Sequence, residues 1–451
     1  MYSIDKRLKS QQEFCQSIQL PALQPMLSDR EIEAICRELG HTWRHRQLPP
    51  GVTLRSMVFR ALHPDHTISR VVDHLAAHGD VSSTLTDSAW CQASARLPEA
   101  LCHEAIVRKA ERLQQLAAGH CLWLGRLLFR ADGSTLSMPD EPDLVKAFGY
   151  ANTRHGPSRF PVARITFLVL AGAEAVWDYR LDDYRCSEEA QFHDMWHRLP
   201  RGCICLCDRK FCSFYNLAKL QQRAIDVVMP LHQRRDSRKL IRNGRKIGRD
   251  DWIVPLDLAP SLRKKYDDPS LPKTLHVRLI RVRKPRPRRG EDLWLVSTLL
   301  DRRRYRRKSV AKLYRARWPI ETRIGSVKTT LELAVLRSKT ERNIRREVAC
   351  VLLAHNLVWT LMHQAAQLTG TPPDRISFAR AIGVIEEYSI RLRYCRRSQR
   401  QELYCQMLER IASHTNPYRP GRIEPRQVKR DRVRYPHLRK PRQQARRECL
   451  S

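Results

Sequence analysis

The chain has 451 residues, long enough for two or three domains that each bury a core of their own. Lys and Arg number 83 against 47 Asp and Glu, so the formal net charge is +36, an excess typical of proteins that bind a polyanion. Clear apolar segments and only 17 Gly argue against a disordered basic tail protein. Nucleic acid is therefore the leading candidate partner.

The cysteines and the apolar segments indicate the cellular compartment in which the protein is expected. None of the 14 cysteines forms a C-x-x-C pair, so neither a zinc finger nor a secreted disulfide framework has positional support. Cys203, Cys205 and Cys207 alternate along a predicted strand. They are more simply interpreted as small buried residues of that strand than as ligands of a zinc ion. The N-terminus lacks the apolar core of a signal peptide, and the most apolar helix is interrupted by His355 and Asn356. We expect a reduced, cytoplasmic protein without a membrane span.

Residues 1–117 are predicted to form a helical N-terminal domain that binds DNA. The segments DREIEAICREL, VTLRSMVFRALH and ISRVVDHLAAHG place apolar residues at three-to-four spacing, and Asp29 is expected to cap the first of them. A further helix is expected over 98–116. The polar face carries arginines that either grip phosphates or are solvated surface charge: Arg44, Arg46, Arg55, Arg60 and Arg70.

The pattern changes to short apolar runs in the next segment, 118–340. LWLGRLLFRAD reads as a strand that ends at Asp132, and RITFLVLAGAEAVWDYRL as two strands around a Gly-containing turn. After a helix over SEEAQFHDMWHRL, the strand CICLC ends at Asp208, and a helix over 213–223 and the strand IDVVMPLH follow. This order predicts an α/β fold with the mixed sheet of a ribonuclease-H-like core.

Two regions surround or interrupt that core. Residues 233–299 are charged and contain Pro, with short β-like runs, and are expected to form a β-rich insertion. From Lys308 the chain is predicted to be helical to about Ile411, with one break at TGTPPDR, and 341–415 form a helical C-terminal region. The Pro- and Arg-rich tail, 416–451, is expected to be disordered when free and to clamp on DNA.

Two aspartates follow buried strands. Because reactive groups of open α/β sheets gather at the carboxyl ends of the strands, Asp132 and Asp208 are expected to open onto the same edge. A bound cation relieves their mutual repulsion, and hard oxygen ligands select Mg²⁺ or Mn²⁺. Two such ions roughly 3.5–4 Å apart suit the cutting and joining of phosphodiester bonds. Either aspartate alone is more simply a helix cap or turn former, so the prediction depends on the joint pattern.

The segment YRARWPIETRIGSVK contains four residues with the spacing Y-(2)-R-(3)-E-(6)-K, which are Tyr314, Arg317, Glu321 and Lys328. Glu321 and Lys328 lie two helical turns apart and share a face, which suits a metal-binding carboxylate and a lysine aimed at a phosphate. Pro319 removes a helical hydrogen bond, so the helix is expected to kink or begin there. The same residues would also suit an ordinary charged helix surface.

On these motifs the sequence resembles bacterial insertion-sequence transposases of the DDE class, in the insertion-sequence-four family with its Y-R-E-K signature. The resemblance extends across most of the chain and includes AWCQASARL, FRADGSTLSMPD, CDRKFCSFYNLAKL and GRDDWIVP. It implies a ribonuclease-H-like core in which Asp132, Asp208 and Glu321 bind two divalent ions. The β-rich insertion then accounts for the long stretch between Asp208 and Glu321.

The resemblance also implies roles in binding DNA. Tyr314, Arg317 and Lys328 fall on signature positions that contact phosphates at the transposon end. Trp252 and Trp318 stand where some relatives stack a tryptophan on a base extruded during hairpin formation, and such stacking is worth roughly 1–3 kcal/mol. For both tryptophans, packing in the core remains the alternative.

The function implied is a DNA transposase of the cut-and-paste type. It would pair two inverted-repeat ends as a homodimer, cut a strand with Mg²⁺ or Mn²⁺, and join the end to target DNA in the bacterial cytoplasm, at the nucleoid. Two alternatives stay open on the residues alone. One is a non-catalytic DNA-binding repressor or decayed transposase, and the other is a structure-selective nuclease with the same core.

Overall fold

The computed structural model describes most of the chain, in two compact units. The described residues are 27–44, 46–77, 79–153, 156–283, 292–315 and 335–417, together with 330, 331, 333, 444, 447 and 448. Unit 1 comprises Met1–Leu116, Leu136–Ala163 and Ser326–Ser451, and unit 2 comprises Ala117–Thr135 and Arg164–Gly325. The domain boundaries expected from the sequence stay a prediction.

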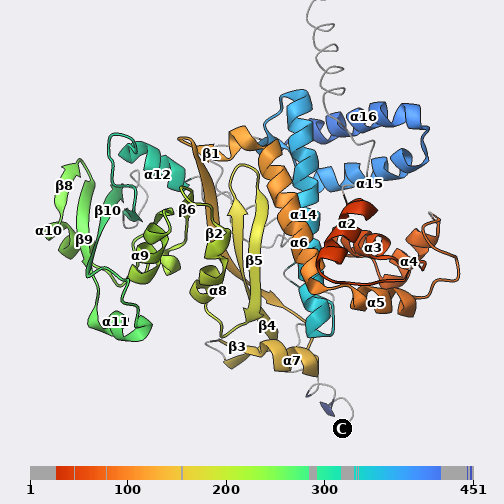
Figure 1. The fold of residues 1–451 in the computed structure, drawn as a ribbon, viewed down its shortest axis with the longest axis horizontal. Coiled ribbons are helices and arrows are strands. Elements are labelled where there is room, and N and C mark those ends of the chain that lie inside the picture. The colour runs from red at the N-terminus through yellow and green to blue at the C-terminus, as the bar shows by residue number, and fades with distance from the viewer. Residues whose placement is uncertain are drawn as a thin grey trace, which may run out of the picture. The chain divides into compact units, whose positions relative to one another are not determined.

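Unit 1 is mostly helical and is built around its longest helix, α14 (Glu341–Thr369). Figure 1 shows α14 running beside α6 (Glu99–Leu116), and α3, α15 and α16 also pack against α14. A short strand, β3 (Tyr150–Thr153), pairs antiparallel with the first part of β4 (Gly156–Leu170). The other helices of the unit are α2 (Asp29–Glu38), α3 (Pro50–Leu62), α4 (Ile68–Ala77), α5 (Asp87–Arg96), α7 (Pro142–Phe148), α15 (Phe378–Tyr394) and α16 (Arg400–Ser413).

The apolar character of α14 reflects burial in a protein core. Its length and mean hydropathy of 1.3 would suit a membrane span, but 89% of that apolar window is buried inside the structure. The two polar residues expected to interrupt the apolar run, His355 and Asn356, are buried as well. Asn356 Nδ2 donates to the carbonyl of Ile106 on α6 at 3.4 Å. The helix is therefore paired along its length by other helices of unit 1.

The start of α2 corrects one prediction. The capping residue is Ser28, whose Oγ accepts from the backbone N–H of Glu31 at 3.2 Å, and Ser28 has extended backbone angles. Asp29 is instead the first helical residue, and its carboxylate accepts from Arg55 at 2.8 Å. Both side chains are able to cap, so the arginine partner, which is distant in the sequence, decided between them.

The C-terminal half is less continuously helical than predicted. The helix α12 (Arg307–Arg315) begins where expected, but 335–340 is not helical. Val335 forms a parallel bridge with Ser137, and the N–H of Leu336 donates to the carbonyl of Ser137 at 2.9 Å. This pairing replaces the hydrogen bonds that a helix would make. The break predicted at TGTPPDR is confirmed by Gly370, which ends α14 at φ +74°. A second, unexpected break separates α15 from α16.

Unit 2 contains the α/β core, and its elements follow the predicted order. Strands β2 (Arg126–Ser137), β4 and β5 (Ala175–Asp183) come first, followed by helix, strand, helix and strand. In the sheet the order is β5-β4-β2-β6-β7, with β2, β6 and β7 parallel. The α/β class and the element order of a ribonuclease-H-like core are confirmed. The later elements are α8 (Glu188–Met195), β6 (Ile204–Leu206), α9 (Phe214–Gln222) and β7 (Asp226–Pro230).

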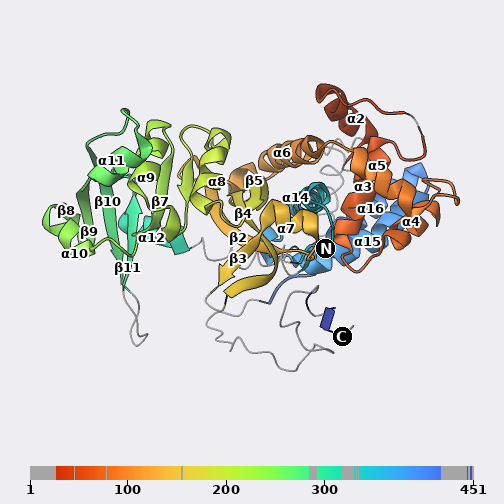
Figure 2. The same cartoon turned by 90° about the horizontal axis from the view of Figure 1, so that it is seen from below.

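The segment after β7 extends the same sheet. Its strands add in the order β7-β11-β10-β9-β8, and all the pairs beyond β7 are antiparallel. Figure 2 shows α9 on one side of β7 and α12 on the other. The elements added are α10 (Ser237–Arg242), β8 (Arg245–Gly248), β9 (Asp251–Asp257), α11 (Pro260–Tyr266), β10 (Thr274–Val282) and β11 (Leu293–Ser297). The buried cluster under α12 consists of Ile204, Leu206, Val228, Ile280, Val282, Leu295, Leu299, Tyr305, Val310, Ala311, Leu313 and Tyr314.

Candidate functional site

Asp132 and Asp208 occupy matching positions on two neighbouring parallel strands of unit 2. Arg130 on β2 is the register partner of Leu206, the last residue of β6. Each aspartate lies two residues beyond its member of this pair. Adjacent strands are about 4.8 Å apart, so the register brings both aspartates to the same edge of the β2–β6 pair. Both are half-buried.

The local setting of the two aspartates differs, and for Asp132 it differs from the prediction. Asp208 lies two residues after the end of β6 and directly before the short 3₁₀ helix η3 (Arg209–Phe211). Asp132 does not end its strand, because β2 continues to Ser137. The prediction of a strand end at Asp132 was wrong in this respect. What ends near Asp132 is the pairing of β2 with the much shorter β6.

Most of the Y-R-E-K signature lies outside the described residues. This holds for Arg317, Glu321 and Lys328, and also for Trp318. Tyr314 is described: it lies on α12, is 7% exposed and belongs to the buried cluster under that helix. The roles expected for these residues remain predictions.

Unit 2 contains a basic cavity of about 730 Å³. Arg209, the residue after Asp208, lines it together with the indoles of Trp252 on β9 and Trp294 on β11. The two indole rings lie 5.8 Å apart, and the guanidinium of Arg281 lies 5.6 Å from the Trp294 ring centre. An indole is suited to stack on the face of a nucleic-acid base, and the neighbouring cationic side chains are suited to contact its phosphate. The remaining polar lining includes His232, Gln233, Arg235, Asp236, Ser237, Arg238 and Asp292.

Trp294 was missed from the sequence, although Trp252 was singled out. Each tryptophan stands in a short apolar segment of the sequence, where packing in the core explains it as well as stacking on a base does. The two strands are not direct neighbours, because β10 lies between β9 and β11. Only the sheet order brings the two indoles to one cavity. Trp252 is half-buried rather than enclosed in the core.

Two of the five N-terminal arginines share a groove of unit 1. Arg44 and Arg46 are exposed and line this groove, of about 870 Å³, with Arg96 and Trp43. Arg55 is instead engaged by Asp29, as described above. The groove therefore places exposed arginines beside an aromatic ring, a composition suited to a DNA strand.

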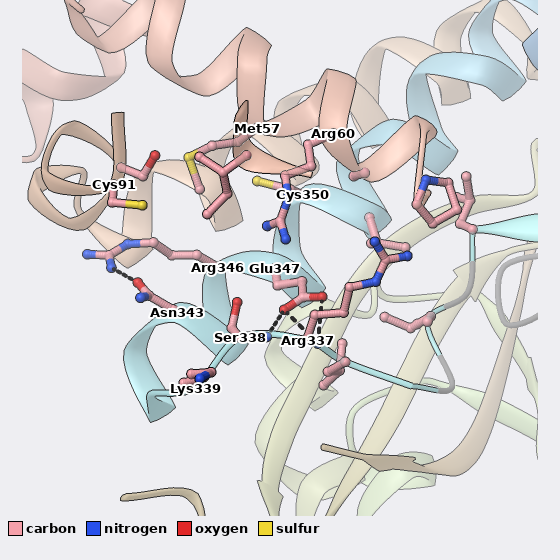
Figure 3. Close-up of a pocket in the computed structure, with 18 of the residues that line it drawn as sticks. Met57, Arg60, Cys91, Arg337, Ser338, Lys339, Asn343, Arg346, Glu347 and Cys350 are labelled. Atoms are coloured by element: carbon pink, nitrogen blue, oxygen red, sulfur yellow. Dashed lines mark hydrogen bonds between the residues drawn. The ribbon is translucent and has the colours of Figure 1, made fainter. Parts of the chain in front are cut away.

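A second cavity of unit 1, of about 340 Å³, is drawn in Figure 3. It lies among α3, α5, α14 and the segment before α14, and it contains Arg60. The carboxylate of Glu347 accepts from the backbone N–H groups of Arg337 at 3.1 Å and Ser338 at 2.9 Å. Arg346 donates to the backbone carbonyls of Ala95 and Leu97 at the end of α5, both at 2.7 Å. The Glu347 bonds fasten the segment before α14 to the helix, and the Arg346 bonds fasten the helix to the end of α5. We therefore assign this cavity's polar wall a structural role.

The donor chemistry of the two aspartates fits a hard divalent cation, because carboxylate oxygens are the ligands that Mg²⁺ and Mn²⁺ prefer. Among the described residues, no group of three or more His, Cys, Asp or Glu is placed to hold a metal. The third expected ligand, Glu321, lies outside them. Cys203, Cys205 and Cys207, on and beside β6, are buried, and burial raises the pKa of Cys203 to about 12, which disfavours the thiolate that zinc requires.

The sequence comparisons identify the family of the chain. Residues 123–357, more than half of the chain, match the Transposase DDE domain family, and the match includes both aspartates and Glu321. The chain therefore belongs to the DDE transposases, in the insertion-sequence-four family.

Two curated relatives come from Escherichia coli (strain K12). The transposase InsG for insertion sequence element IS4 is 26% identical over 404 residues, which cover 88% of each chain. The putative transposase InsZ is 33% identical over 102 residues, which cover 22% of this chain and 34% of that protein. Among solved structures, a synaptic complex of the piggyBac transposase with hairpin DNA is similar with a TM-score of 0.42 and 12% identity, over 89% of this chain and 86% of that one.

Proposed function

We propose that this transposase binds the inverted-repeat ends of its insertion sequence and carries out metal-dependent strand cleavage and strand transfer by a cut-and-paste route. The observation that carries the proposal is the matched register of Asp132 and Asp208 on parallel strands. Arg209, the residue after the second aspartate, lines a basic cavity with two indoles, on a chain with a formal charge of +36. Substrate phosphates would be drawn to such a surface.

Asp132, Asp208 and Glu321 would hold two Mg²⁺ or Mn²⁺ ions. When bound, the metal supplies stabilisation of the negative charge that develops on the reacting phosphate. Asp132 lies within β2, and Asp208 lies between the end of β6 and η3, so regular elements would hold both ligands in place. No covalent bond between protein and DNA is required, so no Ser or Tyr nucleophile is proposed.

The remaining proposed residues hold the DNA. Tyr314, Arg317 and Lys328 would contact phosphates at the transposon end, with Tyr314 anchored in a buried cluster. Trp252 and Trp318 would stack on an extruded base. We add Trp294 to this set, because it shares its cavity with Trp252 and with Arg281.

The larger assembly is proposed on the same grounds. Two copies would pair two transposon ends and then engage target DNA, in the cytoplasm and at the nucleoid. Residues 1–117 would bind the ends through the groove of Arg44 and Arg46, 118–340 would form the catalytic domain, and 416–451 would clamp on DNA.

The experiment replaces each proposed ligand by its amide: Asp132→Asn, Asp208→Asn and Glu321→Gln. Each variant is incubated with Mg²⁺ and a labelled duplex that carries the DNA flanking the gene. We expect loss of cleavage with gel-shift binding retained. Asp268→Asn, which removes an aspartate of unit 2 that lies in the loop after α11 and pairs with Lys219, is the control and should cleave normally. Retained cleavage by any of the three amide variants contradicts the assignment of that residue.

The wild-type protein in the same assay separates the other readings. Cutting without preference for the ends and without strand transfer would indicate a nuclease, and end binding without cutting would indicate a repressor. Binding should also weaken steeply between about 50 and 200 mM salt, because phosphate contacts release counterions. A nearly flat salt dependence would contradict binding through the basic surface.

A further inference from the structure

We propose that Glu188 is a positioning residue of the metal site, which fastens the strand that carries Asp132 to the turn that follows Asp208. The inference rests on the proposed function of those two aspartates. Glu188 is the first residue of α8, on a part of unit 2 that the sequence did not connect with the site. Its side chain contacts both halves of the site, as the following distances show.

The first contact is with Gly133, the residue directly after Asp132. A Cβ atom added to Gly133 would lie 2.4 Å from Cδ and 2.6 Å from Oε2 of Glu188. Real Cβ atoms do not approach other atoms so closely, so the carboxyl group of Glu188 occupies the space that any side chain at this position would need. Asp132 itself accepts a hydrogen bond from the N–H of Gly133 at 3.0 Å. Glu188 therefore rests on the peptide that orients the Asp132 carboxylate.

The second contact is with Lys210, two residues after Asp208. Lys210 Nζ lies 3.1 Å from Glu188 Oε1. The Glu188 side chain is only 13% exposed, whereas that of Lys210 is 69% exposed. The partly buried carboxylate thus holds a lysine that would otherwise be free to move, and with it the η3 turn that begins at Asp208. A charged hydrogen bond of this kind is stronger than a neutral one.

These two contacts join segments that approach one another only in the fold. One carboxylate group touches the residue after the first proposed ligand and pairs with the turn after the second. Residues that orient metal ligands in this way typically change metal affinity by about 10–100-fold when they are removed. Glu188 would therefore set the spacing of the two aspartates without binding the ion itself.

The test measures Mn²⁺ binding by the full chain, by electron paramagnetic resonance of the free ion. We expect Glu188→Gln and Glu188→Ala to raise the dissociation constant about tenfold, with Lys210→Ala intermediate. Lys219→Ala is the matched control, because it removes an ion pair of unit 2 that joins α9 to the loop after α11, Lys219 with Asp268 at 2.9 Å, and does not involve Glu188. Excess Mn²⁺ should restore full occupancy in the Glu188 variants, which a misfolded site would not allow.

Gly133→Ala supplies a second measurement. Its added methyl group should displace Glu188 and weaken Mn²⁺ binding by a similar factor. Adding Glu188→Ala to that variant removes the clash, so the double variant should bind no worse than Glu188→Ala alone. If the two substitutions each weaken Mn²⁺ binding and their effects multiply in the double variant, the proposed contact between Gly133 and Glu188 is contradicted.

The outcomes separate this inference from the proposed function. If Asp132→Asn and Asp208→Asn weaken Mn²⁺ binding while both Glu188 variants stay within twofold of wild type, the role of Glu188 is wrong and the metal site stands. If the aspartate variants also bind as wild type does, the metal site itself is wrong.

Discussion

Arg278 and Asp251 form a fully buried, two-pronged ion pair between β10 and β9. Nε of Arg278 donates to Oδ1 at 2.8 Å, and Nη2 donates to Oδ2 at 2.6 Å. The third nitrogen of the same guanidinium donates to the carbonyls of Tyr305 at 2.6 Å and Leu299 at 3.3 Å. One side chain thus connects the added strands to the loop before α12, the helix that carries Tyr314.

This pair predicts a large loss of stability when one partner is removed. Arg278→Met leaves Asp251 buried without a counter-charge and two carbonyls without a donor, so we expect a loss of about 3–5 kcal/mol. Urea unfolding monitored by circular dichroism measures it. The double variant Arg278→Met with Asp251→Leu should be more stable than Arg278→Met alone. A loss below about 1 kcal/mol in Arg278→Met would show that water or another group compensates the charge.

The basic cavity predicts that Trp294 contributes to binding DNA. Trp294→Ala removes the ring beside Arg281, and we expect binding of a transposon-end duplex with an extruded base to weaken by roughly 1–3 kcal/mol. Trp294→Phe keeps an aromatic face and should lose much less. Fluorescence of 2-aminopurine at the extruded position reports stacking directly. Equal binding by the Ala and Phe variants would argue that Trp294 only packs.

Glu347 predicts that one acid on α14 fastens the segment before the helix. Its carboxylate accepts from the N–H groups of Arg337 and Ser338, and Glu347→Ala should cost about 2 kcal/mol of unfolding free energy. Amide exchange at residues 337 and 338 should accelerate. The control is Glu341→Ala, which breaks a pair with Arg345 one turn along the same helix, partly open to solvent, and should cost about 0.5 kcal/mol or less. Equal costs for the two variants would contradict the special role of Glu347.

We expect Asp268 to contribute to the loss of stability of unit 2 in acid. Hydrogen bonds from Ser270 and then from Lys219 lower the pKa of Asp268 to about 2. A carboxyl whose pKa is lower in the folded than in the unfolded state stabilises the fold above about pH 4, and this contribution disappears as the pH falls toward 2. The urea midpoint of Asp268→Asn should therefore lie below that of wild type at pH 6, with the gap narrowing in acid. If the difference in urea midpoint between wild type and Asp268→Asn widened in acid, the proposed stabilisation by ionised Asp268 would be wrong.

Local patterns in the sequence were sufficient for most elements of the fold. The apolar runs CICLC and IDVVMPLH became the parallel strands β6 and β7, and the periodic segments of the N-terminal region became α3, α4 and α6. Asp208 was correctly placed just after a strand. These features depend on residues within a few positions of one another, which is the range over which periodicity and turn formation act.

Local patterns failed where a distant partner decided the outcome. The cap of α2 shifted to Ser28 because Arg55 engages Asp29, and the helix expected through Val335 is replaced by a bridge to Ser137. Asp132 lies within its strand because β2 extends well past the short β6. For Asp29 and Val335, the deciding contact comes from a residue far along the chain.

The sequence by itself determined the class of this protein: its charge, its acidic residues and their motifs indicated a DDE transposase, and the family match confirms that. Only the tertiary structure decided which residues surround the aspartates. Glu188 meets Gly133 and Lys210, and Trp294 meets Trp252, because strand pairing and helix packing bring together side chains whose separation in the sequence carries no information about their distance.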